Sequence, residues 1–419
     1  MIQSYLDCAV LTGFVCLYAL VSARLQRTPF SAAMVFLLAG WLLSPACLGV
    51  LHLAVDSEGL RGISEFSLAL ILFTDAAQAE LPVLRRSARL PLRLLGLGLP
   101  LTIVVGAVVA HRLFPSWPFV EAALLGVALA PTDAALGQPV VTNPNVPASI
   151  REDLSAESGL NDGICVPALL CLLTLAERPT MPEAGDGLGL LGQFFLQQIG
   201  VGVLVGVALA SLGCWTCDHC ARRGWIAPDW RPVLAVSLAV AVFTLAQSLG
   251  GSGFIGCFCA GLVMGGLTRQ GKEIELIAAE GAGDVFSLVT WMAFGAAVLG
   301  RALAALTRAS LAYAVLSLTL IRMIPVALAT AGLGLPPATT LFVGWFGPRG
   351  LASIVFAVMV LDADVPHGQE IADAITLTVA LSVVAHGLTA VPLAKRFGRA
   401  VAQQRGSAPA LSSSSTPPP

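Results

Sequence analysis

Charged side chains are scarce in this chain of 419 residues. Asp, Glu, Lys and Arg make up 11% of the sequence, whereas 56% of its residues are hydrophobic. A typical soluble domain carries roughly 25% charged residues, which it needs to cover its surface. The shortage of charge excludes a soluble globular protein, and the excess of apolar residues excludes a disordered chain. Lipid must therefore be the solvent for most of this sequence.

Other features are missing as well. The chain has no His-Glu-x-x-His zinc motif, and no signal-peptide cleavage pattern follows its first apolar run, so we expect that run to remain as the first membrane span. The net charge is −2, which implies no bulk nucleic-acid partner. Ten cysteines are scattered, mostly in apolar runs, where a thiol acts as a small hydrophobic side chain.

Apolar runs bounded by charged or turn residues predict an all-α polytopic membrane protein with about 13 transmembrane helices. Helices are expected because an open sheet edge cannot face lipid. At about 20 residues per span, the length allows roughly this number plus loops. The predicted spans are 5–23, 30–53, 62–79, 91–111, 118–142, 151–176, 188–216, 231–249, 253–268, 276–299, 303–331, 338–361 and 369–394.

The distribution of basic residues supports this count and predicts an orientation. With the N-terminus outside and the spans alternating, most of the 23 basic residues fall on the inner side, among them clusters at 85–93 and 395–405. The outer side receives only five, which are Arg61, Arg112, Arg178, Arg301 and Arg308. This is the positive-inside bias of membrane proteins. We expect a multi-pass protein of the cell inner (plasma) membrane, with the N-terminus outside and the C-terminus in the cytoplasm.

Two predicted spans are interrupted by Gly and Pro. The fifth contains Ala-Pro-Thr-Asp at 130–133, and the twelfth contains Gly-Pro-Arg-Gly at 347–350. Such paired breaks point to a transporter binding site, although Gly and Pro are also common in ordinary membrane helices. The two breaks are seven spans apart, and an odd offset reverses orientation. Spans one to six and eight to thirteen are therefore expected to be inverted repeats, with span seven as a linker.

Ionisable side chains inside predicted spans are costly and usually functional. The chain places four acids and two bases there: Asp75, Asp133, Glu157, Asp162, Arg322 and Arg349. Two arginines can neutralise only two of the four carboxylates, so the remainder needs a proton or a mobile cation. This balance predicts a cation/proton exchanger. The alternative, strongest for the two arginines, is a buried ion-pair network that only holds helices together.

Oxygen ligands surround the break in the fifth span. On the sixth span, residues four apart share a helix face, which aligns Glu157 with Asn161 and Ser158 with Asp162. Unwinding of the fifth span frees backbone carbonyls next to Thr132. Hydroxyl, carbonyl and carboxylate oxygens suit hard cations, so a transition-metal site is disfavoured.

Several other polar residues carry weaker hypotheses. Cys214, Cys217 and Cys220 are a minor zinc candidate, against the expectation of ordinary thiols at a helix end. A further set is expected to be solvated or hydrogen-bonded: Glu65, Glu121, Asp284, Asp373 and His386.

Two stretches of the chain are characteristic. The segments 130–144 and 157–163, the latter reading Glu-Ser-Gly-Leu-Asn-Asp-Gly, resemble the monovalent cation/proton antiporters of the bacterial NhaP and animal NHE type. The segment 346–350 is similar to that family's twelfth-helix motif. The resemblance covers about 1–398 and implies a thirteen-helix inverted-repeat antiporter fold of the NhaA/NhaP kind.

The resemblance also implies roles for the site residues. Asp162 would bind the cation and the proton alternately. Asn161 would brace the unwound helix and accompany electroneutral exchange. Thr132 would offer its backbone carbonyl and Ser158 its hydroxyl, and Asp75 is the candidate for an additional acidic ligand on the third helix.

Two ion pairs and a division into domains follow from the same resemblance. Asp133 would pair with Arg349, and Glu157 with Arg322. The chain would divide into an interface domain through which it forms a homodimer (1–88 and 217–300), an ion-translocating core (89–178 and 301–398) and a linking seventh span (179–216). Composition adds a disordered cytoplasmic tail at 399–419.

We therefore expect an antiporter that exchanges Na⁺, Li⁺ or K⁺ for protons at 1:1 stoichiometry by alternating access around Asp162, without a cofactor and without enzymatic activity. One alternative is a sodium-coupled organic solute symporter, which would need a second intramembrane polar cluster that the sequence lacks. Another is a membrane aspartyl protease, which would need a second catalytic aspartate opposite Asp284.

Overall fold

The structure of this chain is a computed structural model that describes residues 2–25, 28, 30–53, 58–78, 89–177, 192, 196–267 and 272–406. All regular secondary structure in these ranges is helical, and they contain no strand. This confirms the predicted all-α class.

Many predicted spans correspond to one continuous helix. These helices are α1 (Ile2–Leu25), α2 (Ala32–Leu43), α3 (Glu58–Gln78), α9 (Ala148–Glu177), α11 (Val201–Arg222), α12 (Arg231–Ser248), α13 (Gly253–Leu267) and α20 (Gly368–Gly406). Two more spans run through a π-helical turn, one through α5 (Arg89–Arg93), η1 (Leu94–Gly98) and α6 (Leu99–Leu113), the other through α14 (Lys272–Phe294), η4 (Gly295–Leu299) and α15 (Gly300–Ala304). A third π-helical turn, η2 (Leu196–Gly200), leads directly into α11.

Three spans are broken into two helices. The fifth span consists of α7 (Phe119–Ala128) and α8 (Ala134–Val141), and the twelfth of α18 (Pro337–Trp345) and α19 (Leu351–Asp362). Both interruptions fall where the Gly and Pro residues predict them. The eleventh span is also divided, into α16 (Arg308–Leu318) and α17 (Leu320–Thr330), with Thr319 between them at φ −115° and ψ −97°. No Gly or Pro stands at this third break, so the sequence did not predict it.

Eight helices in the described part of the chain are long and apolar enough to cross a membrane. Four shorter apolar helices accompany them, namely Ala32–Leu43, Phe119–Ala128, Gly253–Leu267 and Leu351–Asp362. Two of these four are halves of broken spans. The total of thirteen spans remains a prediction.

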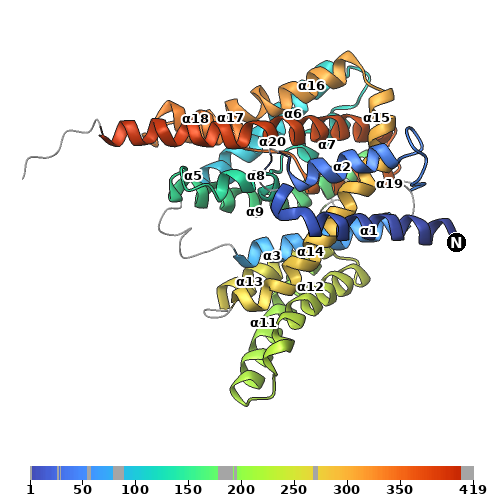
Figure 1. Cartoon of the computed structure of the whole chain (residues 1–419), viewed down its shortest axis with the longest axis vertical. Helices are drawn as coiled ribbons and strands as arrows, with labels where there is room; N and C mark the ends of the chain where they lie inside the picture. The colour runs from blue at the N-terminus through green and yellow to red at the C-terminus, as the bar shows by residue number, and fades with distance from the viewer. Residues whose placement is uncertain are drawn as a thin grey trace, which may run out of the picture.

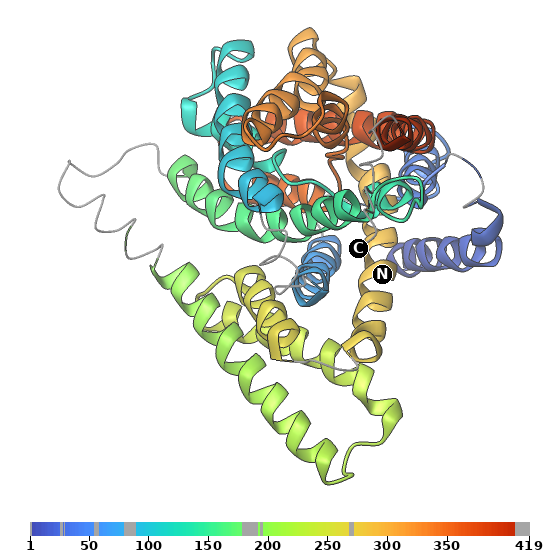
Figure 2. The same cartoon turned by 90° about the vertical axis from the view of Figure 1, so that its left-hand side faces the viewer.

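The helices pack in two groups (Figures 1 and 2). One group is formed by α3 and α11 to α14, in which α3 packs on α13 and α14. The other contains α6 to α9 and α16 to α20, in which α20 packs on α16 and α19. The helix α9 belongs to the second group and also contacts α3 and α13 of the first, so it lies where the two groups meet. All the polar residues predicted for the site lie on or beside α9 or on the two broken spans that surround it.

Some predictions need correction or lie outside the described residues. Helix α20 continues to Gly406, so residues 399–406, which the sequence assigned to a disordered tail, are helical because the apolar pattern does not mark where a solvated helix ends. The remaining tail residues 407–419, most of the linker 179–195 and part of the inner arginine cluster lie outside the described residues.

Candidate functional site

The breaks in the fifth and twelfth spans lie against each other and are joined by their backbones. The peptide N–H of Asp133 donates to the carbonyl of Pro348 at 2.8 Å. The Asp133 carboxylate then accepts two further peptide N–H groups, from Leu136 at 3.1 Å and from Leu351 at 2.9 Å. These donors lie in the first turns of α8 and α19, whose amides have no partner within their own helices. One carboxylate therefore caps two helix N-termini and compensates both positive dipole ends.

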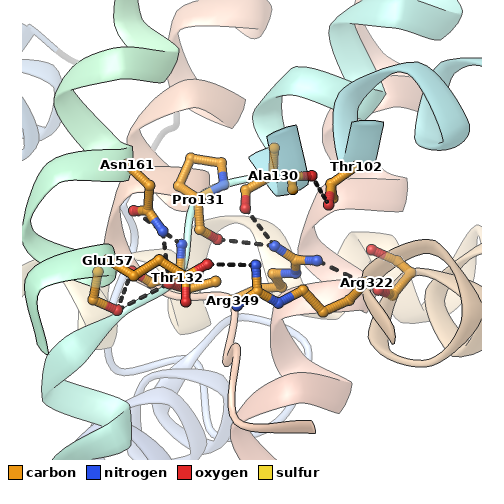
Figure 3. A network of polar contacts seen from close by, with 11 residues as sticks. Thr102, Ala130, Pro131, Thr132, Glu157, Asn161, Arg322 and Arg349 are labelled. Carbon is orange, nitrogen blue, oxygen red and sulfur yellow. Dashed lines mark hydrogen bonds and ion pairs between the residues drawn. The ribbon is translucent and has the colours of Figure 1, made fainter. Parts of the chain in front are cut away.

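Arg349 donates hydrogen bonds to carbonyls at the C-terminal ends of two helices in broken spans. Its fully buried guanidinium donates to the carbonyls of Ala130 at 2.6 Å and Pro131 at 3.2 Å, just past the C-terminus of α7 (Figure 3). It also donates to the carbonyl of Ser317 at the end of α16, at 3.4 Å. A positive charge at helix C-termini opposes the negative end of the helix dipole.

The predicted pair of Asp133 with Arg349 stays a prediction. Among the described residues the structure gives Arg349 backbone carbonyl partners and gives Asp133 backbone amide partners. The physical reason is that two crossed helix breaks leave unpaired peptide groups of both polarities, and each charged side chain satisfies the groups of opposite sign.

Glu157 and Arg322 form the ion pair that the resemblance implied. The two side chains are 2.6 Å apart and are 2% and 1% exposed, respectively (Figure 3). The pair joins α9 to α17. Removing one partner of such a buried pair leaves an uncompensated charge, so each residue depends strongly on the other.

Thr132, Ser158 and Asn161 form a closed hydrogen-bond network between the fifth-span break and α9 (Figure 3). Asn161 accepts the peptide N–H of Thr132 at 3.3 Å and donates to its hydroxyl at 2.7 Å. The Ser158 hydroxyl donates to the Thr132 carbonyl at 2.9 Å and lies 2.9 Å from the Thr132 hydroxyl, which can donate in return. Both polar faces of Thr132 are thus fixed by α9, and its carbonyl is held beside the sixth-span motif.

Asp162 differs from the other acids of the site. It is buried, and its Oδ1 atom has no hydrogen-bond partner among the residues that the structure describes. The charged groups that act on it are Asp133 and Asp75, which are both acidic. A buried carboxylate in such surroundings must be neutralised by a proton or a cation.

Asp75 reaches the site from the other helix group. It lies on α3 against Gly159 of α9, where an added methyl group would lie 3.4 Å from the Asp75 Cβ atom. The charges acting on Asp75 include Asp133, Glu280 and Asp284. The structure therefore brings Asp75 next to the Glu157–Asp162 turn of the sixth span.

Two glycines allow the fifth-span and twelfth-span breaks to cross closely, a role that the sequence did not reveal. A Cβ atom at Gly350 would overlap the Asp133 carboxylate, and one at Gly347 would lie 2.6 Å from the Arg322 Nε atom and 3.1 Å from a Thr132 methyl group. Both positions must therefore lack a side chain. The position of these glycines on either side of Pro348 and Arg349 is the sequence pattern that could have indicated a close approach.

Ser382 and His386 on α20 were also missed as parts of the site. Ser382 accepts the peptide N–H of Arg349 at 2.7 Å, and the His386 Nε2 atom lies 2.9 Å from the carbonyl of Trp345. His386 is hydrogen-bonded, as expected, to partners that its place in the sequence does not identify.

The minor zinc hypothesis for the cysteines of α11 is not supported. No group of three or more His, Cys, Asp or Glu side chains in the described ranges is arranged to hold a metal ion.

Known proteins resemble this chain over most of its length. The family model described as "Sodium/hydrogen exchanger, transmembrane" matches residues 11–396. The chain is 25% identical over 346 residues to the K(+)/H(+) antiporter NhaP2 of Shewanella oneidensis, which covers 80% of this chain and 57% of that protein. It is 26% identical over 378 residues to the K(+)/H(+) antiporter NhaP of Alkalimonas amylolytica, a match that covers 89% of this chain and 63% of that protein. It is 30% identical over 247 residues to the Na(+)/H(+) antiporter NhaS2 of a Synechocystis strain, a match that covers 57% of this chain and 44% of that protein. The chain thus spans less than two-thirds of the length of these relatives.

A solved structure has the same fold. The sodium proton antiporter MjNhaP1 from Methanocaldococcus jannaschii superposes with a TM-score of 0.75 at 20% identity, covering 91% of this chain and 99% of that chain. This likeness confirms the predicted fold class.

Proposed function

This chain belongs to the sodium/hydrogen exchanger family, and we propose that it exchanges a monovalent cation for protons across a membrane. The names of its relatives include both K⁺/H⁺ and Na⁺/H⁺ antiporters, so K⁺, Na⁺ and Li⁺ are all candidate substrates. These names also favour antiport over a sodium-coupled solute symporter.

The observation that carries the proposal is the state of Asp162. The other acids of the crossing have partners, since Asp133 accepts peptide N–H groups and Glu157 pairs with Arg322. Asp162 is buried, and one of its carboxylate oxygens has no hydrogen-bond partner among the described residues. A proton and a small cation can each neutralise it, but they compete for the same carboxylate. Alternating occupancy of one site is the requirement for exchange.

The neighbouring oxygens would complete the coordination of the cation. The carbonyl and hydroxyl of Thr132 and the hydroxyl of Ser158 are fixed beside the turn that carries Asp162. Oxygen donors of this kind suit hard cations. Asp75 would add a second carboxylate from α3. Asn161 contributes no charge, so one cation replaces one proton and both loaded states carry the same net charge.

The carrier would work by alternating access, in which the core helices move against the interface helices around a fixed site. In this proposal residues 89–178 and 301–398 form the moving core, and 1–88 and 217–300 form the interface domain of a homodimer. The protein would lie in the plasma membrane with its N-terminus outside, as the arginine distribution predicts.

The test is cation-driven proton movement in proteoliposomes, measured separately with Na⁺, Li⁺ and K⁺ and with the membrane potential clamped at several values. We expect exchange with at least one cation at a rate that does not depend on voltage. A rate that follows voltage would contradict the 1:1 stoichiometry, and the absence of exchange with all three cations would contradict the antiport proposal itself.

A further inference from the structure

The break in the twelfth span removes one specific backbone hydrogen bond. In a continuous α-helix the peptide N–H of Arg349 would donate to the carbonyl of Trp345, four residues earlier. Here the Arg349 N–H donates instead to the Ser382 hydroxyl at 2.7 Å. The Trp345 carbonyl is reached by Nε2 of His386 at 2.9 Å. Both halves of the lost hydrogen bond thus have a side-chain partner on the same helix, α20, and the Trp345 carbonyl also accepts the peptide N–H of Gly347 at 2.9 Å.

The two partners are also linked to each other. Ser382 and His386 are four residues apart, so they share one face of α20. The Ser382 Oγ atom and the His386 Nδ1 atom are 3.1 Å apart, and both side chains are buried. An unbroken chain of hydrogen bonds therefore runs from the Arg349 amide through Ser382 and His386 to the Trp345 carbonyl.

One proton arrangement serves every link of this chain. A peptide N–H can only donate and a carbonyl can only accept, so with its hydrogen on Nε2 the His386 ring donates to Trp345. Ser382 then accepts from Arg349 and gives its own proton to Nδ1. Nδ1 also lies 3.0 Å from the Ser382 carbonyl. A neutral ring protonated on Nδ1 would donate to that carbonyl instead, and the Trp345 carbonyl would keep the peptide N–H of Gly347 as its donor.

We propose that Ser382 and His386 are positioning residues that together replace the missing helical hydrogen bond and hold the twelfth span open at 346–350. The open segment lets the Arg349 side chain reach the carbonyls of Ala130 and Pro131, next to Thr132. The consequence for transport rests on the proposed exchange function, whereas the hydrogen-bond substitution itself does not.

A second contact from α20 supports the same placement. The indole N–H of Trp345 donates to the Thr389 hydroxyl at 3.0 Å, and the Trp345 and His386 rings lie 5.2 Å apart between centroids. The end of α18 is therefore fixed to α20 by both its backbone and its side chain.

Removing the link has a definite expected consequence. Ser382→Ala leaves the Arg349 amide without its acceptor, and His386→Leu removes one of the two donors that reach the Trp345 carbonyl, the other being the peptide N–H of Gly347. In the double variant a direct hydrogen bond from Arg349 to Trp345 would relieve the stranded amide, because unpaired peptide groups are strongly disfavoured away from water. This bond would form across Pro348, whose ring opposes a regular helix. Its formation would withdraw Arg349 from the fifth-span carbonyls.

The test is a double-mutant cycle with two readouts, thermal stability of the purified protein and the apparent KM for the transported cation. We expect each single variant to lower the melting temperature and the double variant to lower it by less than the sum. All three variants should raise the apparent KM by about tenfold, the effect of losing one buried hydrogen bond. Thr378→Val is the matched control, because that buried hydroxyl on α20 bonds only the carbonyl of Ala374 in its own helix, and its KM should stay within about twofold of the wild type.

Conservative variants keep the test independent of folding failures. His386→Gln retains an N–H donor and Ser382→Thr retains a hydroxyl, so both should keep a KM near that of the wild-type protein. Additive losses of stability, or a Gln variant indistinguishable from His386→Leu, would overturn the proposal.

Failure of the proposed function is separable from failure of this inference. If the wild-type protein exchanges no cation, the stability cycle and the ¹⁵N chemical shifts of His386 still decide the hydrogen-bond assignment. We expect the neutral tautomer with hydrogen on Nε2, and a ring protonated on Nδ1 alone would contradict it.

Discussion

Among the buried acids of the crossing, partners decide the role of each residue. Asp133 is held by peptide amides and Glu157 by Arg322, so both are committed to structure. The buried Oδ1 atom of Asp162 has no hydrogen-bond partner in the described part of the chain. A change that removes its charge while keeping its shape should therefore affect transport far more than folding.

Asp162→Asn is the variant that separates these effects. The amide removes both the titratable proton and the negative charge, so we expect exchange to be abolished with each cation. The melting temperature should stay the same or rise, because an uncompensated buried charge is lost. Proteoliposome exchange and thermal unfolding measure the two outcomes, and wild-type exchange by this variant would refute the central role of Asp162.

Arg349→Ala should act mainly on stability. The change leaves the carbonyls of Ala130, Pro131 and Ser317 without their charged donor, and we expect a loss of about 2–4 kcal/mol from the hydrogen bonds of a buried charged group. Arg349→Lys, which keeps the charge but not the planar fork, should lose less. Equal melting temperatures for the wild type and Arg349→Ala would contradict the capping role.

At the scale of elements, the crossing depends on close approach of two backbones. The twelfth span passes the Asp133 carboxylate at Gly350, where a Cβ atom would overlap that carboxylate. This position therefore requires the space that glycine leaves.

Gly350→Ala should consequently be strongly destabilising. Its methyl group would displace the carboxylate that caps α8 and α19, and we expect a loss of about 1–3 kcal/mol from overpacking and a corresponding fall in melting temperature. Gly281→Ala is the matched control, because a methyl group there meets no atom within 4 Å on the exposed side of α14. The control should be neutral or slightly stabilising, since Ala favours helix over Gly.

The sequence was sufficient for some elements and not for others. Breaks at 130–133 and 347–350 were predictable because Pro and Gly interrupt the helical hydrogen bonds locally. The break at Thr319 has no such residue. Next to it the Ser317 carbonyl accepts a hydrogen bond from the guanidinium of Arg349, which is 32 residues away in sequence. Spacing along the chain also could not tell Arg349 from Arg322, because both are buried arginines. Their partners depend on which helix ends meet in space.

At the scale of the whole molecule, one ion pair joins the helix groups at the surface. Arg61 at the start of α3 lies 3.1 Å from Asp362 at the end of α19. The topology predicted from sequence places this pair on the outer side. If the groups move against each other during transport, the pair must separate in each cycle.

Replacing this arginine, as Arg61→Gln, should therefore raise the maximal exchange rate. The stability change should stay below about 1 kcal/mol, because the Arg61 side chain is 54% exposed. Arg112→Gln, another exposed arginine predicted on the outer side, is the control. An unchanged or slower rate in Arg61→Gln would show that separation of this pair does not limit the cycle.

The contact between Asp133 and Pro348 has a consequence for how this architecture is inherited. Its two atoms are a peptide nitrogen and a peptide oxygen, 2.8 Å apart. Substitution exchanges side chains and leaves peptide groups in place, and only proline at position 133 would delete the donor. The crossing can therefore persist while the residues around it diverge. Proteins that share about a quarter of their residues with this chain can retain this hydrogen bond without the same residue type at either position.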